Sequence, residues 1–347
     1  MDDVSLPSLQ ETDKSFNQIL AGGAKTKLLE SFVAISLTEL LFRCERLSCR
    51  KIAEELDLHP LRTQKWLHLL GLIGLLEESE GEEEGQKALL YGLSPLGYGL
   101  VDEKGKVFAY SSDKVNFWQA VAEIDFIPVL RGKPLPLAVR WPPRTFDSAY
   151  HLEWWMSATA EGAIKAIEKS LNLKDYKNML DAAGGAGTMA CHFANQYPDL
   201  VITMFNLPNS AYLARENIVA NGLVERVFVE ERNFITDESL PTGFDIVLWS
   251  RVLCDWPSEA VISLLEKTRH ALLPGGEIVI CEPLVEGNED LIIAWEFRYI
   301  FSDDFGVACY KTREEYEFLL RESGFEMCSF TPPDEDSFYS VIRARRL

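Results

Sequence analysis

The chain has 347 residues and a formal net charge of −20, with 47% hydrophobic and 25% charged residues. This composition excludes a collagen, a low-complexity chain and a largely disordered acidic protein. A length beyond about 250–300 residues indicates two domains, and the acidic charge argues against binding nucleic acid or acidic membranes over the whole surface.

The seven cysteines are scattered and form no CxxC pair. Neither a zinc site nor a disulfide framework is therefore indicated, and we expect no metal. The first residues lack the basic-then-apolar pattern of a signal peptide, and no apolar run approaches the roughly 20 residues of a membrane span. We expect a cytoplasmic protein that does not associate with membranes.

Residues 1–110 predict helices followed by a hairpin. Apolar residues recur at helical spacing over 28–41, Ser48 is a suitable N-cap for a helix to residue 56, and Pro60 suits the start of a helix over 61–71. Two strands, 72–77 and 88–93, are expected on either side of an acidic loop at 77–84. This order is typical of a helix-turn-helix with a β-wing.

A winged helix raises the possibility of DNA binding, and the second helix does carry Arg62, Gln64 and Lys65. The expected wing, however, is a run of glutamates, which would repel phosphates within a Debye length of about 10 Å. We therefore interpret the winged helix as an interaction module and expect no nucleic-acid partner.

Residues 111–170 carry no net charge and predict a helical linker interrupted by two Pro-rich breaks. A long helix is expected over 150–171, and it carries Trp154 and Trp155. Adjacent side chains cannot share one helix face. We expect one tryptophan in the core and the other in a pocket or interface.

Residues 171–347 carry a net charge of −14 and alternate between strand and helix patterns, which is typical of a parallel sheet in an α/β fold. Expected strands cover 178–182, 201–206, 227–230, 244–249 and 277–281. Expected helices cover 187–197, 210–221 and 257–273, with a turn at 273–276. A helix over 312–323 and a final hairpin that ends in 338–343 complete the prediction.

A glycine-containing loop follows the first of these strands. The segment Ala182–Gly187 reads AAGGAG, so the backbone can approach a ligand while the next helix offers free N–H groups. The second strand ends about 20 residues later at Asn206, where a polar side chain can hold ribose hydroxyls. Dinucleotide enzymes also use such a loop, so the loop alone does not decide the ligand.

The loop, followed by NLP at 206–208, SRVLCDWPSE at 250–259 and LLPGGEIVICEP at 272–283, resembles the S-adenosylmethionine-dependent small-molecule O-methyltransferases. This family includes caffeate-type, acetylserotonin and bacterial tailoring enzymes. The resemblance implies a mainly α winged-helix dimerisation domain (1–110), a helical linker that contributes to the substrate pocket (111–170) and a Rossmann-like catalytic domain (171–347). It also implies S-adenosyl-L-methionine as cofactor and a homodimer formed through the N-terminal domain.

The resemblance further assigns roles to individual residues. Cofactor contacts are expected from Ala183, Gly184, Gly185, Asn206, Leu207, Asn233, Phe234, Ser250, Arg251 and Trp256. The acceptor pocket is expected to include Trp155 and Met156. Glu282 matches the carboxylate that orients the catalytic base in the family.

Five positions depart from the family pattern. Ala183 stands where the loop usually begins with glycine, and Asn206 and Asn233 replace aspartates at the ribose and adenine positions. Cys254 replaces the catalytic histidine, and Tyr310 stands where a second carboxylate is usual.

The replacement at Cys254 leaves three alternatives for methyl transfer. A thiol with a pKa near 8.5 is mostly protonated at neutral pH and is a poor base. The acceptor could arrive already ionised, so that the enzyme supplies proximity and orientation. Another residue, His151, Tyr310 or Glu282, could be the base. The methylated atom could instead be carbon or nitrogen, because WPPRT at 141–145, NLP and the lost histidine also resemble the bacteriochlorophyllide C-20 methyltransferase branch.

We therefore expect a methyltransferase of secondary metabolism that acts on a small aromatic or conjugated acceptor, with a hydroxyl oxygen as the first expectation. A non-methylating enzyme built on the same fold is the remaining alternative. Four linker cations are expected to border the acceptor entrance and favour an anionic substrate: Arg131, Lys133, Arg140 and Arg144.

Overall fold

The structure is a computed structural model that describes residues 7–83, 85–137 and 140–347. The chain divides into two compact units, an N-terminal unit of Met1–Pro128 and a C-terminal unit of Val129–Leu347. Within the described residues, no helix combines the length and the apolar character that are needed to cross a bilayer. The division into three segments at residues 110 and 170 stays a prediction.

The N-terminal unit is mainly helical with one small sheet. Its elements are α1 (Leu9–Ala34), α2 (Leu37–Cys44), β1 (Arg46–Ser48), α3 (Cys49–Glu55), α4 (Pro60–Leu72), β2 (Leu76–Glu83), β3 (Gln86–Leu93), α5 (Pro95–Gly99) and α6 (Ala109–Ala122). Helix α7 (Phe126–Leu130) crosses the boundary between the units. The expected helix over 28–41 is interrupted, because Ile35 adopts an extended conformation that ends α1 before α2 begins.

Helices α3 and α4 are followed by the hairpin of β2 and β3, which β1 joins in the antiparallel sheet β1-β3-β2, so the predicted order of elements is present. Its interpretation as a winged helix stays a prediction. The expected acidic loop is wrong, since residues 76–83 form strand β2 itself and pair with β3 in register from Leu76↔Leu93 to Glu83↔Gln86. A strand tolerates these glutamates because successive side chains alternate between faces, and Glu82 lies opposite Lys87.

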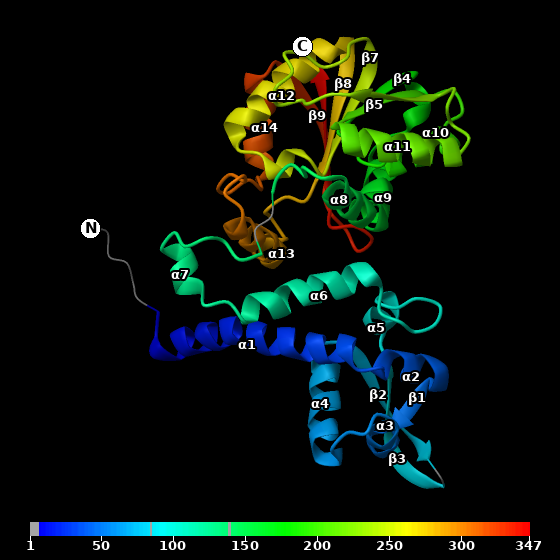
Figure 1. Cartoon of the computed structure of the whole chain (residues 1–347), viewed down its shortest axis with the longest axis vertical. Coiled ribbons are helices and arrows are strands. Elements are labelled where there is room, and N and C mark those ends of the chain that lie inside the picture. Colours follow the sequence, from blue (N-terminus) through cyan, green and yellow to red (C-terminus); the bar gives the residue numbers. More distant parts are fainter. Residues whose placement is uncertain (1–6, 84, 138–139) are drawn as a thin grey trace. The chain divides into compact units, whose positions relative to one another are not determined.

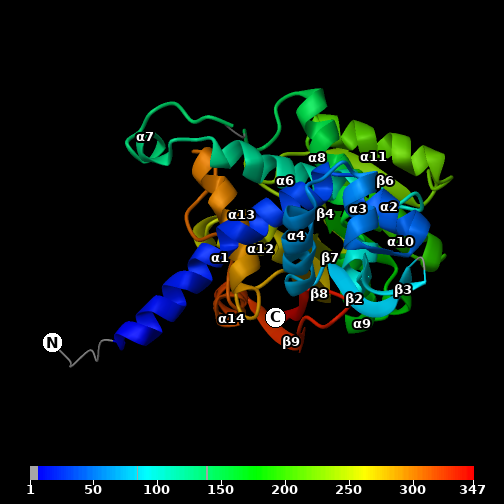
Figure 2. The ribbon, with the colours of Figure 1, turned by 90° about the horizontal axis from the view of Figure 1, so that it is seen from below.

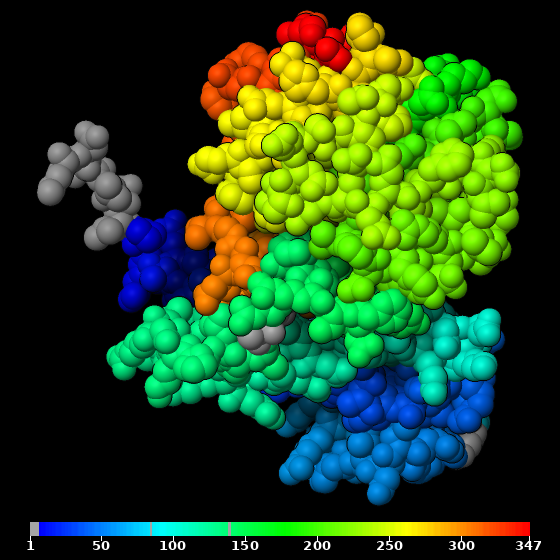
Figure 3. Space-filling view, turned by 45° about the horizontal axis from the view of Figure 1, so that its top comes forward, coloured from blue at the N-terminus to red at the C-terminus, as the bar shows by residue number. Residues whose placement is uncertain are grey.

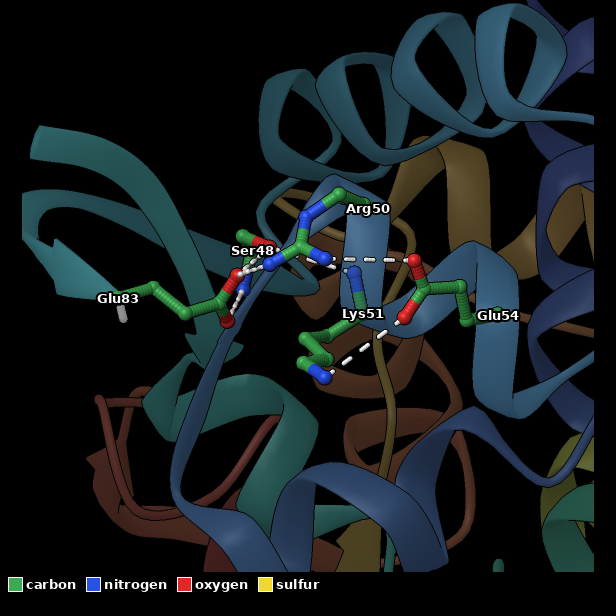
Figure 4. Close-up of polar contacts among 5 residues, drawn as sticks. All are labelled: Ser48, Arg50, Lys51, Glu54 and Glu83. Atoms are coloured by element: carbon green, nitrogen blue, oxygen red, sulfur yellow. Dashed lines mark hydrogen bonds and ion pairs between the residues drawn. The ribbon is translucent and has the colours of Figure 1, made fainter. Parts of the chain in front are cut away.

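The start of α3 is held by the end of the wing (Figure 4). Ser48 caps the helix by accepting a hydrogen bond from the amide of Lys51, as the sequence predicts, and both its hydroxyl and its amide donate to the carboxylate of Glu83. Arg50 forms ion pairs with Glu54 and Glu83, and Lys51 with Glu54. These carboxylates offset the positive charge of the first turn of α3.

Helix α1 presents an apolar face to solvent. It packs against α6 and α4, and Figure 2 shows its N-terminal half projecting away from the other helices of this unit. Leu9 and Ile19 are 87% and 76% exposed, and Phe16 and Leu20 are also exposed. Spacings of three and four residues place Phe16, Ile19 and Leu20 on one side of the helix.

The C-terminal unit alternates helices and strands around one sheet (Figure 1). Its elements are α8 (Phe146–Ala158), α9 (Glu161–Ser170), η1 (Leu173–Asp175), β4 (Asn178–Ala182), α10 (Thr188–Gln196), β5 (Val201–Asn206), α11 (Pro208–Ala220), β6 (Val227–Glu231), β7 (Phe244–Ser250), η2 (Leu253–Asp255), α12 (Ser258–Ala271), β8 (Leu272–Glu282), α13 (Glu289–Glu296), η3 (Phe297–Phe301), α14 (Arg313–Glu322), β9 (Phe325–Thr331) and β10 (Ser340–Arg346).

The seven strands follow the order β6-β5-β4-β7-β8-β10-β9, with β10 antiparallel to both of its neighbours. Alternate strand residues face two separate cores, as in Met179 and Leu180 of β4. One core packs against α9, α10 and α11, and the other packs against α12 and α14. The result is the three-layer α/β fold that the sequence predicts.

Two expected elements differ in the structure. The expected long helix over 150–171 is two helices, because α8 ends at Ala158 and α9 starts at Glu161. The Thr159 hydroxyl donates to the Trp155 carbonyl and accepts from Arg251, so a residue distant in sequence stabilises the break. The expected turn at 273–276 is wrong, because these residues are part of strand β8, which starts at Leu272.

Candidate functional site

The loop after β4 has a backbone that requires small residues. Ala183, Gly185 and Gly187 have φ values of +56°, +58° and +75°. A Cβ on Gly184 would collide with the Asp181 carboxylate. The left-handed conformation costs a residue with a side chain about 1–2 kcal/mol, so Ala183 occupies a conformation for which glycine is better suited. The loop therefore keeps a left-handed backbone at Ala183 although that residue is not glycine.

Two asparagine side chains hold the carbonyl groups of this loop. Asn206, at the end of β5, donates from Nδ2 to the Gly185 carbonyl over 2.6 Å. Asn217 on α11 donates in the same way to the Ala186 carbonyl over 2.8 Å. Leu207 follows as the N-cap of α11. The amide group of Asn206 therefore positions the loop, a contact that an aspartate in this place could make only if protonated.

The segment after β6 makes a turn beside an aromatic cluster. The Asn233 side-chain oxygen accepts from the Ile235 amide, and the Asn233 amide donates to Asp237. Phe234 packs edge-on against Trp249 and Trp256, with ring centroids 5.7 and 5.6 Å away. The two predicted adenine residues thus lie in a rigid turn with an apolar wall.

Arg251 joins the end of β7 to helix α8. Its Nη2 donates to the Met156 carbonyl over 2.8 Å, and its Nη1 donates to the Thr159 hydroxyl over 3.0 Å. Ser250, the last residue of β7, pairs with Cys281 of β8. The structure thereby brings together Ser250, Arg251 and Met156, which sequence analysis assigned to the cofactor site and the acceptor pocket.

Two buried carboxyl groups next to the glycine loop were missed by the sequence analysis. Asp181 is 2% exposed, and its Oδ2 has no hydrogen-bond partner among the described residues. Burial raises the pKa of Asp181 to about 7, although the nearby Arg251 opposes that shift. Glu153 on α8 is 5% exposed, and burial raises its pKa as well. Asp181 could have been noticed as an acidic residue near the end of a buried strand, whereas nothing in the sequence around Glu153 pointed to its burial.

Cys254 lies buried in the short helix η2 and is a protonated thiol. Burial and the neighbouring carboxylate of Glu282 raise the pKa of Cys254 well above its usual value. Glu282 is fully buried, and its Oε1 accepts the amides of Val252 and Leu253, each over 2.8 Å. Burial raises the pKa of Glu282 to about 7. The carboxylate thus fixes the backbone around Cys254, and the thiol is unsuited to be a base.

An aromatic wall surrounds Cys254. Cys254 packs with Ile292 and Tyr310 in one cluster, with Trp295 and Tyr299 against it. Tyr299 and Tyr310 stack at 6.3 Å, and Trp295 lies 5.8 Å from Tyr310. Burial raises the pKa of Tyr310, so this phenol also remains protonated. A planar apolar ring would suit such a wall.

The wall continues to the surface through a contact that is distant in sequence. Phe305 stacks on Tyr299 at 4.0 Å, and Trp141 stacks on Phe305 at 5.2 Å. The Trp141 amide donates to Asp304 over 3.0 Å. Figure 3 shows the orange surface of the segment after α13 bordering the green surface of the segment around residue 141. The Trp141 indole N–H is buried without a partner among the described residues.

Asp255, next to Cys254, is an ionisable group that the sequence analysis did not select. Burial raises its pKa to about 6, and the hydrogen bond from Tyr299, 2.5 Å long, opposes that shift. At neutral pH this carboxyl group is therefore mostly ionised. Its position within the motif SRVLCDWPSE was the available signal.

A buried lysine completes the ionisable groups around Cys254. Lys311 is 2% exposed, and its ammonium donates to the carbonyls of Leu253, Trp256 and Cys309. Burial lowers the pKa of Lys311, while Cys254 and Glu282 oppose that shift. The ammonium thus anchors the η2 segment that carries Cys254.

The remaining predicted pocket residues lie on α8. Trp155 and Met156 are half-buried, and Trp154 is exposed. His151 is exposed, with its ring stacked on Trp154 at 6.0 Å. The role of His151 as a base stays a prediction.

The described residues fit a cationic nucleoside cofactor. The glycine loop provides close backbone approach, and the Asp181 oxygen without a partner provides a hydrogen-bond acceptor at its edge that a cation would help to ionise. Phe234 and the turn at Asn233 provide an apolar surface for a base. A sulfonium compound with an adenine ring carries these complementary features.

Comparison with known proteins gives a consistent result. Residues 151–326 match the family model described as an O-methyltransferase domain. The chain is 33% identical over 125 residues to a 3-hydroxy-5-methyl-1-naphthoate 3-O-methyltransferase of Streptomyces sahachiroi, covering 36% of each chain. It is 26% identical to a bacteriochlorophyllide d C-20 methyltransferase of Chlorobaculum tepidum, covering 54% of this chain and 56% of the relative. It is also 26% identical to an L-tyrosine C(3)-methyltransferase of Streptomyces lavendulae, covering 90% and 86%.

Two solved structures share the fold over nearly the whole chain. The apo form of the S-adenosylmethionine-dependent methyltransferase SibL has a TM-score of 0.75 and 23% identity, covering 96% of this chain and 98% of that one. Human N-acetylserotonin methyltransferase in complex with its cofactor has a TM-score of 0.65 and 20% identity, covering 100% and 99%. The expected Rossmann-like fold is confirmed.

Proposed function

Because the chain belongs to the family of S-adenosylmethionine-dependent O-methyltransferases, we propose that it methylates a small planar aromatic or conjugated acceptor in secondary metabolism. The observation that carries this proposal is the position of the aromatic wall around Cys254, which follows strand β7 closely in the chain, since β7 ends at Ser250. Bound S-adenosyl-L-methionine supplies an electrophilic methyl group on a sulfonium.

The chain's residues would hold the cofactor along the carboxyl ends of β4, β5 and β6. The loop of Ala183, Gly184 and Gly185 would approach its amino-acid portion. Asn206 and Leu207 would lie at the ribose and adenine, and Asn233 and Phe234 would flank the adenine. Ser250, Arg251 and Trp256 would border the sulfonium end. The fixed loop and the rigid turn support these roles.

The acceptor would lie between the aromatic wall and α8. Tyr310, Tyr299 and Trp295 would support its ring, and Trp155 and Met156 would close the other side. The protonated Cys254 and Tyr310 support a mechanism in which neither residue removes a proton. The enzyme would then supply proximity and orientation to an acceptor that is acidic enough to ionise. Arg140 and Arg144, on either side of Trp141, would favour such an anion.

Methylation at carbon is the second candidate. The loss of an imidazole at position 254 favours it, because an activated aromatic carbon needs no hydroxyl base during attack. Two relatives, named for methylation at C-20 of bacteriochlorophyllide d and at C3 of tyrosine, support it as well. A nitrogen acceptor would fit the same geometry.

The N-terminal unit is proposed to form a homodimer with a second copy of this chain. The exposed apolar face of α1 supports this, because Leu9, Phe16, Ile19 and Leu20 would otherwise face water. Light scattering at micromolar concentration should give twice the chain mass, and a strictly monomeric mass would contradict the proposal. The exposed glutamates of β2, Glu77, Glu80 and Glu82, would repel phosphates and support the absence of a nucleic-acid partner.

The test of the catalytic proposal is incubation of the full chain with S-adenosyl-L-methionine and a panel of planar phenols, naphthoates and conjugated tetrapyrroles. Mass spectrometry should detect S-adenosylhomocysteine together with a product that is heavier than the acceptor by one CH2 unit, because a methyl group replaces a hydrogen. Fragmentation of the product then distinguishes oxygen from carbon or nitrogen. Conversion of an acceptor without S-adenosylhomocysteine would instead indicate the non-methylating alternative.

A further inference from the structure

Glu153 packs directly against the glycine loop from helix α8. A Cβ on Gly185, whose φ is +58°, would collide with the Glu153 carboxylate, so glycine is required on steric grounds as well as by its backbone conformation. Glu153 is only 5% exposed. A long acidic side chain is rarely buried to this extent unless partners compensate its charge.

The partners of Glu153 fix its place but only partly offset the cost of burying its charge. The Ser210 hydroxyl, the Ala186 amide of the loop and Arg251 lie near its carboxylate and favour its ionised form, against the effect of burial. That same guanidinium also interacts with Asp181, while its two Nη atoms donate to Met156 and Thr159. The Arg251 guanidinium therefore interacts electrostatically with both buried carboxyl groups, Glu153 and Asp181.

The carboxyl groups reach the loop from different elements. Asp181 belongs to β4 and faces Gly184, whereas Glu153 belongs to α8 and faces Gly185. The Asp181 Oδ2 is buried without a partner among the described residues. When both groups are ionised, a ligand with one positive charge would balance the site, because Arg251 balances only one of them.

We propose that Glu153 binds the α-ammonium group of the amino-acid portion of the cofactor, as a specificity-determining residue for a ligand with a free amine. This inference rests on the proposed function, because it assumes that the loop receives S-adenosyl-L-methionine. The chemistry that recognises the ligand is a charge-assisted hydrogen bond from the ammonium to a carboxylate in a site sheltered from water. Binding of the cofactor would thereby fix the position of helix α8, which also contains Trp155 and Met156.

The test measures equilibrium binding by titration calorimetry on the full chain. The ligands are S-adenosylhomocysteine and its analogue in which hydrogen replaces the α-ammonium group. Glu153→Gln keeps the size of the side chain and its ability to accept hydrogen bonds, and it removes the charge. We expect this variant to bind S-adenosylhomocysteine at least tenfold more weakly, and the analogue with an unchanged affinity. Glu161→Gln, on the exposed first turn of α9, is the matched control and should change neither affinity.

Three results would overturn the inference. The first is an unchanged affinity of Glu153→Gln for S-adenosylhomocysteine, and the second is an equal loss for both ligands, which would indicate a structural role. The third applies even if the variant does not fold: equal binding of both ligands by the unmodified chain would show that the ammonium is not recognised. No binding of either ligand by the unmodified chain would contradict the proposed function itself.

Discussion

The guanidinium of Arg251 donates a hydrogen bond of 2.8 Å to the main-chain carbonyl of Met156, across 95 residues of sequence. A second hydrogen bond from the same group reaches the Thr159 hydroxyl. Arg251 therefore satisfies carbonyl and hydroxyl oxygens at the end of α8, where a helix has no partners of its own. Through this contact the end of β7 fixes the position of the expected acceptor-pocket residues.

Arg251→Lys should destabilise the protein, because one ammonium cannot reproduce the fork of two donors. We expect a loss of about 1–2 kcal/mol in the free energy of unfolding, measured by denaturant titration. Arg215→Lys, at an exposed ion pair with Glu231, is the matched control and should cost much less. Equal stability of the two variants would show that Arg251 does not fix α8.

Cys254→Ala should reduce methyl transfer to the best acceptor by less than about tenfold. A general base contributes roughly 10²–10⁴-fold, and the buried, protonated thiol is unsuited to that role. The measurement is kcat with saturating cofactor, with Cys328→Ala at an exposed position as control. A loss beyond a thousandfold would make Cys254 a catalytic residue after all.

Tyr299→Phe should shift the acid limb of the pH profile of kcat/KM to higher pH. The hydrogen bond from Tyr299 lowers the pKa of Asp255, which burial has raised to about 6, so its removal raises that pKa further. Asp255 follows Cys254 directly in η2, and we expect turnover to need its carboxylate ionised, so the variant should lose activity at a higher pH than the unmodified chain. Tyr212→Phe, at an exposed tyrosine of α11, should leave the limb in place. An acid limb at the same pH in Tyr299→Phe and in the unmodified chain would show that Asp255 takes no part in the reaction.

Trp141→Ala should raise the acceptor KM at least fivefold and leave the affinity for S-adenosylhomocysteine unchanged. The variant removes the outer ring of the wall, which stacks on Phe305, and the loss of a buried aromatic contact is worth about 1 kcal/mol or more. Phe318→Ala, at an exposed ring on α14, is the control. Equal KM values for both variants would place the acceptor elsewhere.

Asp181→Asn should flatten the dependence of stability on pH. The carboxyl group has a folded-state pKa of about 7, above its unfolded value, so the folded protein binds the extra proton between about pH 4 and 7. Its contribution to stability is present below the unfolded pKa and is lost as pH rises to 7. The variant should gain about 2 kcal/mol relative to the unmodified chain between pH 5 and pH 8. Glu282 adds a slope of the same sign in both proteins. Parallel stability curves would contradict the buried position of the Asp181 carboxylate.

Local features of the fold could be predicted from the sequence. The Ser48 cap, the glycine loop and strands such as β4 and β5 depend on neighbouring residues, and the structure confirms them. The acidic segment of β2 was mistaken for a loop, because its pairing with β3 compensates its weak strand preference. The break between α8 and α9 was missed because its stabilising partner, Arg251, lies far along the chain.

Residues of the candidate site could be predicted only where they lie in a recognisable sequence motif. The resemblance selected Cys254, Glu282 and Tyr310, and the structure brings these three residues together. Glu153 was missed because its burial depends on the packing of α8 against a loop more than 30 residues later. Trp141 was not assigned to the pocket because its stacking partner, Phe305, is remote in sequence. Side-chain contacts between distant segments leave no periodic signal.

The central claim is that the loop around Gly185 binds S-adenosyl-L-methionine, and titration calorimetry of the full chain with S-adenosylhomocysteine tests it most directly. We predict one site per chain with a Kd in the micromolar range, about −8 kcal/mol. Gly185→Val should abolish this binding, because its side chain would collide with Glu153 and its φ is +58°. Gly222→Val is the matched control, since Gly222 also has a positive φ but no atom lies within 4 Å of its Cβ position. Gly222→Val should introduce the same kind of backbone strain as Gly185→Val and should still bind S-adenosylhomocysteine. An unmodified chain that releases no heat and shows no thermal stabilisation with S-adenosylhomocysteine would contradict the account.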